Sequence, residues 1–332
     1  MNLIYNNELR TMTDRLVRAW EQVDVAGIEE MILPNACVDF DIFRQRLDRG
    51  GLLRKIAQRP RKIAYARFET LNNIVVMGHE KARQSLAMIG IYADPNDGEW
   101  TKYTFEGTFA FEFEKTAEGW KYSSVKFMLT DENVIRWPRL LSSGIPQVRG
   151  TGDPSFVSNW VAPSHEDRIG YFADKRLPVI NPVYDSPWYG MNDRIRPEHE
   201  EELIQEAFFR YAFGIDFNNF RLWEDVFTED CQCIYGDTRP YTKRGVVEFL
   251  KAEKQGSSRC THTGFFTSVQ IDGDTALGKL YLRAPAFHQD TEITPAELDK
   301  RPSWARYILR FRQEKGLWRI CQLNFFAGLT NH

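Results

Sequence analysis

The feature that most constrains the fold of this chain is an internal repeat that runs through nearly all of its 332 residues. The repeat is marked by four pairs of identical residues, in the same order and 192 to 198 residues apart: Asp24 and Asp216, Cys37 and Cys231, Gly78 and Gly273, Trp120 and Trp318. A constant order with slowly drifting spacing is typical of a tandem duplication. We therefore expect two domains of similar fold, each of ordinary size.

The second copy shows the pattern of elements more clearly than the first. Leu203, Ala207 and Tyr211 follow helical spacing, and a second apolar stripe covers 220–227. A third short helix is expected over 243–254, and strand-like runs follow over 261–271, 275–284, 305–311 and 317–326. Helices followed by a meander of antiparallel strands predict an α+β domain. The first copy has a matching last strand pair over 98–115 and 118–130.

The segment between the copies differs from both. Residues 135–196 contain seven of the 15 prolines and show no sustained hydrophobic period, yet they are rich in Trp, Tyr and Phe. A flexible linker is poor in aromatic residues. We therefore expect three parts: a domain over 1–134, an ordered strap over 135–196 that packs against one or both domains, and a domain over 197–332.

Composition excludes several classes of protein. Positive and negative charges nearly cancel, at a net charge of −3, which argues against a nucleic-acid binder. No apolar run is long enough for a membrane span, and the N-terminus lacks the pattern of a signal peptide. Five cysteines without framework spacing fit a reducing compartment, so we expect a cytoplasmic protein. Cys231 and Cys233 are expected to pack in the core rather than to bind a metal.

The order of elements in each copy, helix, Asp, helix, strand, short helix and long strands around a Gly-Trp or Leu-Trp pair, resembles the nuclear transport factor 2-like superfamily. It is most similar to the SnoaL-like branch, which includes scytalone dehydratase, bile acid 7α-dehydratase and ketosteroid isomerase. The resemblance implies two cone-shaped domains, each with three helices against a curved antiparallel sheet around an apolar pocket. It also implies an intramolecular pseudo-dimer of the two domains, and an outer sheet face suited to a homodimer.

Three residues of the second copy resemble the dehydratase pattern: Tyr211, Asp216 and His262. The resemblance implies that His262 takes a proton from a carbon next to a carbonyl, since an imidazole titrates near neutral pH. Asp216 would orient the imidazole, and Tyr211 would donate a hydrogen bond to the developing oxyanion. Taken from the residues alone, Asp216 could instead be the N-cap of the following helix.

The function implied is a lyase (dehydratase) or isomerase that needs no cofactor or metal and acts on a small apolar cyclic ketone or alcohol. Trp223, Phe265, Arg283 and His288 are the expected substrate contacts, with Arg283 suited to an acidic group. The alternative is a non-catalytic protein of the same fold that binds a hydrophobic ligand or acts in assembly.

The first copy departs from this pattern. Asp24 is retained, but the position of Tyr211 is occupied by Ala19 or Trp20, and that of His262 by Arg67. A carboxylate facing an arginine forms an ion pair and offers no acid–base group near neutral pH. We therefore expect the first copy to be catalytically degenerate.

Overall fold

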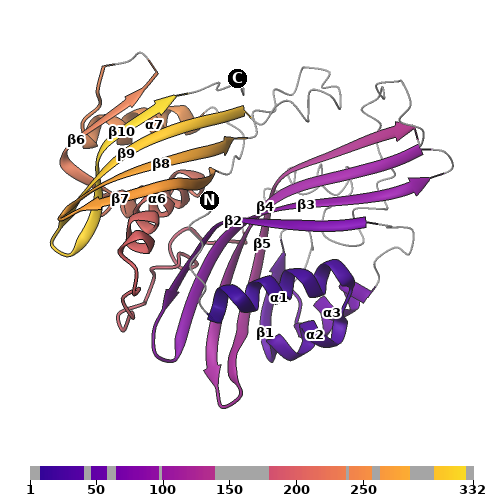
Figure 1. The fold of residues 1–332 in the computed structure, drawn as a ribbon. Helices are drawn as coiled ribbons and strands as arrows, with labels where there is room; N and C mark the ends of the chain where they lie inside the picture. The colour runs from indigo at the N-terminus through magenta and orange to yellow at the C-terminus, as the bar shows by residue number, and fades with distance from the viewer. Residues whose placement is uncertain are drawn as a thin grey trace. The chain divides into compact units, whose positions relative to one another are not determined.

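The computed structural model describes residues 8–40, 46–57, 65–96, 99–138, 179–236, 239–255, 262–284 and 303–326. These residues form two compact units, one ending at Ile195 and the other beginning at Arg196 (Figure 1). We call them the N-terminal and C-terminal domains. Each is described by itself.

The N-terminal domain places its helices together beside a five-stranded sheet (Figure 1). In chain order the elements are α1 (Glu8–Gln22), α2 (Val25–Met31), β1 (Ile32–Phe40), α3 (Arg49–Ala57), β2 (Tyr65–Met77), β3 (Lys81–Asn96), β4 (Glu99–Thr116) and β5 (Gly119–Pro138). The strand order is β1-β5-β4-β3-β2. Neighbouring strands are antiparallel except β1 and β5, which are parallel.

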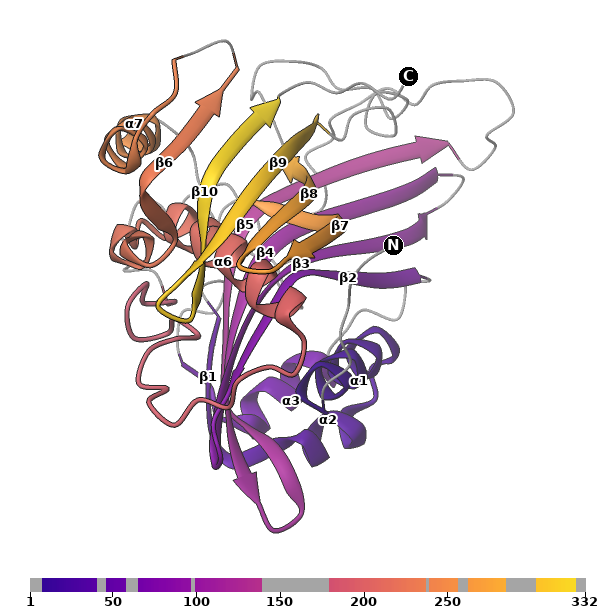
Figure 2. The ribbon, with the colours of Figure 1, turned by 60° about the vertical axis from the view of Figure 1, so that its left-hand side comes forward.

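The C-terminal domain repeats this topology, and its first helix, α6, contacts β10 and β7 of the sheet (Figure 2). Its elements are α6 (Glu200–Asp216), η1 (Phe220–Glu224), β6 (Phe227–Tyr235), α7 (Lys243–Gln255), β7 (Thr263–Asp272), β8 (Thr275–Ala284), β9 (Ser303–Glu314) and β10 (Leu317–Phe326). The order β6-β10-β9-β8-β7 again contains one parallel pair, β6 with β10.

The α+β class is confirmed, with two differences in detail. The sheets are mixed rather than antiparallel, because the strand after the second helix runs parallel to the last strand of its domain. The second helical element of the C-terminal domain is a 3-10 helix of five residues, whereas α2 is an α-helix of seven. A segment this short often takes the tighter 3-10 geometry, which sequence periodicity does not separate from an α-helix.

Contacts at equivalent positions recur in both domains. Trp120 and Trp318 each occupy the second position of the last strand. The basic residue that follows each tryptophan donates to a carbonyl at the end of the second helix: Lys121 Nζ to Glu30 O at 2.6 Å, and Arg319 Nη1 to Glu224 O at 2.7 Å. The two domains therefore share local bonding as well as strand order.

The N-terminal core lies where the apolar face of α1 meets the sheet. Leu9 and Leu16 are buried, as the amphipathic pattern of α1 requires. Between helix and sheet the rings of Trp20, Phe40 and Phe109 pack at centroid distances of 5.8 to 6.1 Å. These packed aromatic rings make this part of the N-terminal core apolar.

Residues 179–195 of the expected strap pack on the N-terminal domain. Asp185 forms an ion pair with Lys126 of β5, at 2.8 Å, and Ser186 O accepts from Arg83 of β3 at 3.4 Å. The amide of Ile195 donates to Met77 O at 2.8 Å, at the sheet's edge strand β2. Residues 139–178 of the strap lie outside the described residues.

Among the described residues no helix is both long enough and apolar enough to cross a membrane. The same residues contain no group of three or more His, Cys, Asp or Glu side chains that could hold a metal ion.

Candidate acid–base site of the C-terminal domain

Asp216 and His262 lie in contact, although 46 residues separate them. Asp216 is the last residue of α6, and His262 immediately precedes β7. One carboxylate oxygen, Oδ2, accepts the backbone N–H of His262 at 2.8 Å, and the other, Oδ1, contacts the imidazole Nδ1. The side chains are only 8% and 17% exposed. Both carboxylate oxygens of Asp216 are thus engaged by a single residue, which holds the imidazole in one orientation.

Asp216 is not an N-cap. The 3-10 helix η1 begins after Asn219, three residues further on, and no side chain caps it. Asp24, by contrast, does cap a helix, because its side chain accepts the N–H of Gly27 at 3.0 Å at the start of α2. The two aspartates that the sequence pairs therefore have different roles: Asp24 caps a helix, and Asp216 contacts His262.

Tyr211 lies deep in the domain, five residues before Asp216 on α6. Its side chain is 1% exposed, and its hydroxyl is 3.2 Å from the hydroxyl of Tyr235, at the end of β6. The ring of Tyr307, on β9, packs against the ring of Tyr211 at a centroid distance of 6.4 Å. Burial raises the pKa of both the Tyr211 and Tyr235 phenols well above the usual value. We call Tyr211, Tyr235 and Tyr307 the phenol cluster.

The sequence analysis did not predict Tyr235 and Tyr307 as site residues, although the alternation of residues along β6 points to Tyr235. Cys231, Cys233 and Tyr235 alternate along β6, and both cysteines are buried. Alternation of this kind places the three side chains on the same, inward face of a strand. Tyr235 keeps partial exposure, and its ring packs against Phe249 of α7 at 5.1 Å and Phe325 of β10 at 5.8 Å.

Trp223, an expected substrate contact, is a core residue. Its side chain is 1% exposed, its ring stacks on Tyr211 at 5.5 Å, and its Nε1–H donates to the Tyr211 carbonyl at 3.1 Å. Gly214 leaves room for the indole, because a Cβ at that position would lie 2.3 Å from Trp223 Nε1. In this arrangement Trp223 supports the helix that carries Tyr211 and Asp216.

The other expected substrate contacts are placed only in part. Phe265 lies on β7, paired with Tyr281, and Arg283 lies on β8, paired with Thr263, the neighbour of His262. Only the backbone of Phe265 and Arg283 is described, and His288 lies outside the described residues.

The structural counterpart of Asp216 in the N-terminal domain is Glu21, not Asp24. Each of these acids precedes by two residues a backbone of positive φ, at Val23 (58°) and Asn218 (56°). Glu21 Oε1 accepts the N–H of Phe68 at 2.6 Å, just as Asp216 accepts that of His262. Phe68 therefore stands where the C-terminal domain has His262.

These pairings correct the expected correspondences of Asp24 with Asp216 and of Arg67 with His262. The helical segment that follows Glu21 differs in length from the one that follows Asp216, which misaligned Asp24 with Asp216. On strand β2 the counterpart of His262 is Phe68, one residue after the expected Arg67. Because side chains alternate along a strand, a one-residue error exchanges the two faces.

The phenol cluster is also absent from the matching N-terminal positions. Strand register pairs Phe40 and Phe109 with Phe127, as it pairs Tyr235 and Tyr307 with Phe325. Tyr211, five residues before Asp216, corresponds in the same way to Leu16 rather than to Ala19 or Trp20. The N-terminal copy thus has apolar residues at all four positions: Leu16 for Tyr211, Phe40 for Tyr235, Phe109 for Tyr307 and Phe68 for His262.

The C-terminal domain is thus an α+β domain that holds a carboxylate–imidazole pair, Asp216 and His262, and a separate cluster of tyrosines. Residues 198–324 match the family model of the SnoaL-like domain. The C-terminal domain is therefore similar to the SnoaL-like domain family, as its element order predicts. Comparison with curated protein sequences finds no match.

Solved structures of several proteins are similar to part of the chain. A proposed aromatic ring hydroxylase from Novosphingobium aromaticivorans is 17% identical, with 38% of this chain and 90% of that one covered and a TM-score of 0.34. A proposed scytalone dehydratase from the same organism is 8% identical, with 41% and 92% covered and a TM-score of 0.35. A hexachlorocyclohexane dehydrochlorinase from Novosphingobium barchaimii is 9% identical, with 43% and 92% covered and a TM-score of 0.34.

Proposed function

We propose that the C-terminal domain catalyses proton abstraction next to a carbonyl, as a dehydratase or isomerase of a small, mostly apolar cyclic ketone or alcohol. The observation that carries this proposal is the double contact between Asp216 and His262. A neutral imidazole with Nδ1–H held by a carboxylate has Nε2 as its basic nitrogen, and the carboxylate stabilises the imidazolium that forms.

The proposed step is balanced within the domain and the substrate. His262 Nε2 takes the proton from the carbon α to the carbonyl, and the electrons of the broken C–H bond form an enolate. In a dehydration, the enolate expels a β-hydroxyl group, which leaves as water with the proton returned by His262. In an isomerisation, the proton returns to another carbon of the same enolate.

The phenol cluster supports an oxyanion-stabilising role. A phenol of raised pKa stays protonated at neutral pH, so it can donate a hydrogen bond to an enolate oxygen without carrying charge. Tyr211 is enclosed, whereas Tyr235 keeps partial exposure. We therefore assign the substrate contact to Tyr235, with Tyr211 and Tyr307 as positioning residues.

The alternative is a non-catalytic protein that binds a hydrophobic ligand. The close packing around Tyr211 favours it, because Phe208, Trp223 and Phe227 contact this ring at 5.5 to 5.9 Å. A binder of this kind needs an apolar interior but no base, so loss of the imidazole would leave its affinity intact.

Deuterium exchange separates the two functions. The full chain is incubated in D2O with 1-tetralone, an apolar cyclic ketone, and exchange at the carbon next to the carbonyl is followed by NMR. We expect exchange above the buffer rate, and a loss of about 10²–10⁴-fold in His262→Ala. Exchange that is equal in the wild type and His262→Ala would reject the proposal, and retained ligand binding without exchange would establish the alternative.

A further inference from the structure

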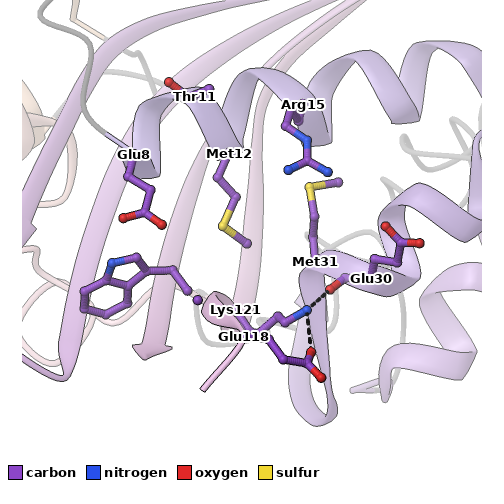
Figure 3. Close-up of a pocket in the computed structure, with 10 residues that line it drawn as sticks. Glu8, Thr11, Met12, Arg15, Glu30, Met31, Glu118 and Lys121 are labelled. Carbon is purple, nitrogen blue, oxygen red and sulfur yellow. Dashed lines mark hydrogen bonds and ion pairs between the residues drawn. The ribbon is translucent and has the colours of Figure 1, made fainter. Parts of the chain in front are cut away.

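The N-terminal domain has its own surface pocket, whose lining does not include Glu21 or Phe68, the counterparts of Asp216 and His262. The pocket has a volume of about 410 Å³ and lies between the start of α1, the end of α2 and the β4–β5 turn (Figure 3). Met12 and Met31 point into it and are themselves buried, so they form an apolar floor. Glu8 and Arg15 of α1 lie at its two ends (Figure 3).

Arg15 has lost the partners that its counterpart keeps. Arg15 lies six residues before Glu21, and Arg210 lies six residues before Asp216. Arg210 pairs with Glu206 at 2.7 Å, and the residue matching Glu206 in α1 is Thr11. Among the residues that the structure describes, Arg15 forms no ion pair, so its guanidinium is available to an anion.

The second cation of the pocket is already neutralised. Lys121 forms an ion pair with Glu118 at 3.4 Å and donates to the carbonyl oxygen of Glu30 at 2.6 Å (Figure 3). Arg15 is therefore the cation that remains for a ligand carboxylate. A bidentate guanidinium–carboxylate contact also fixes the orientation of such a ligand.

Glu8 supplies the opposite charge at the other end. Glu8 and Trp120 both line the pocket. A carboxylate at this end of the pocket attracts an ammonium group by charge. The Trp120 ring itself already has Lys115 Nζ over it, at 5.6 Å from its centroid. Within the described part of the chain Glu8 forms no ion pair.

The spacing of the two charges sets the ligand's length. Glu8 and Arg15 are seven residues apart on α1, which puts them on one face of the helix and about 10 Å apart along its axis. In Figure 3, Met12 lies between them and Met31 lies directly below Arg15. We propose that this pocket binds a small linear zwitterion, with its carboxylate on Arg15, its ammonium group at Glu8 and an apolar spacer over Met12 and Met31. An ω-amino acid has this chemistry, whereas the two charges of an α-amino acid are too close together.

Calorimetric titration of the full chain with 6-aminohexanoate tests the proposal. Hexanoate, hexylamine and glycine serve as ligand controls, since each lacks one charge or the spacer. We expect 6-aminohexanoate to bind at least tenfold more tightly than any of the three. Absence of binding, or equal binding of hexanoate or hexylamine, would overturn the proposal.

Variants locate the site. Arg15→Gln and Glu8→Gln should each weaken binding by tenfold or more, whereas Arg18→Gln and Glu114→Gln, at exposed positions outside the pocket, should not change it. In a sample labelled at the methionine methyl groups, the ligand should shift the NMR signals of Met12 and Met31. Binding that survives both pocket variants, or that leaves these signals unmoved, would contradict the proposed site. Neither readout depends on turnover in the C-terminal domain.

Discussion

The carboxylate of Asp216 binds His262 twice, through its backbone N–H and through the imidazole Nδ1. Glu21 makes only the first of these contacts, because its partner Phe68 has no imidazole. The carboxylate-to-strand bond is therefore a structural feature that both domains share. The C-terminal domain adds the imidazole contact. The carboxylate that accepts the strand N–H there also holds the imidazole of His262 in one orientation.

Replacement of Asp216 by Asn should separate these two contributions. The amide oxygen can still accept one N–H, so the fold should persist with a loss of about 1–3 kcal/mol in the free energy of unfolding. The imidazole loses the charge that stabilises its protonated form, so turnover should fall by about 10²–10⁴-fold. Rates of deuterium exchange and urea unfolding measure the two effects.

Glu21→Gln is the matched control for that change. It alters the equivalent carboxylate in the N-terminal domain and should leave turnover unchanged, with a similar small loss of stability. If Glu21→Gln lowered turnover as much as Asp216→Asn, the activity would not belong to the C-terminal site.

Removal of the hydroxyls of the phenol cluster should affect turnover more than stability. Tyr235→Phe should lower kcat by about 10²-fold with little change in KM, because the hydrogen bond strengthens as the oxyanion forms. Tyr211→Phe should have a smaller effect, because Tyr211 acts through Tyr235 at 3.2 Å. The double variant should be no worse than Tyr235→Phe alone. Additive losses would show that Tyr211 acts on the substrate independently.

Stability should fall at alkaline pH. The pKa values of Tyr211 and Tyr235 are raised in the folded protein, so these phenols keep their protons where an unfolded chain, with phenol pKa near 10, loses them. The stabilisation is complete below pH 10 and decreases as the pH rises above it. Urea unfolding between pH 8 and 11 should show a shallower decrease in Tyr235→Phe, and identical slopes would contradict the assignment.

Trp223 should matter for stability rather than for substrate recognition. Trp223→Ala removes a buried ring that stacks on Tyr211, and large-to-small changes of this kind cost about 3–5 kcal/mol. Phe220→Ala, at a partly exposed position of the same 3-10 helix, should cost clearly less. Thermal melting measures both. A Trp223→Ala variant with unchanged melting temperature and raised KM would restore the role in substrate binding.

Asp185 should anchor residues 179–195 on the N-terminal domain. Asp185 accepts from Lys126 and from the amide of Asn181 at 2.6 Å, and it is largely buried. Asp185→Ala leaves the partly buried ammonium of Lys126 without its partner and should cost about 1–3 kcal/mol. The double variant Asp185→Ala with Lys126→Met should recover much of this loss, and no recovery would mean that the pair itself contributes little.

Sequence patterns predicted the likeness to the SnoaL-like domain and the pairing of Asp216 with His262, but not the internal correspondences. Helix periodicity and strand alternation predict the order of elements, because each is a local property. The pairing of Asp24 with Asp216 was wrong because Asp24 follows α1 whereas Asp216 is the last residue of α6. Only the positive-φ residues show that the two aspartates differ by three positions. Tyr307 carries no sequence signal, since it is one of several aromatic residues in a buried strand.

The sequence by itself determined that the chain is a tandem α+β protein with a SnoaL-like C-terminal domain, because repeat spacing and hydrophobic period survive without knowledge of any long-range contact. Only the tertiary structure decided that Asp216 meets His262, that Tyr235 stands beside Tyr211, and that Leu16, Phe40, Phe109 and Phe68 replace this set in the first copy. Such contacts depend on sheet register and helix packing, where a shift of one residue turns a side chain from the interior to the opposite face.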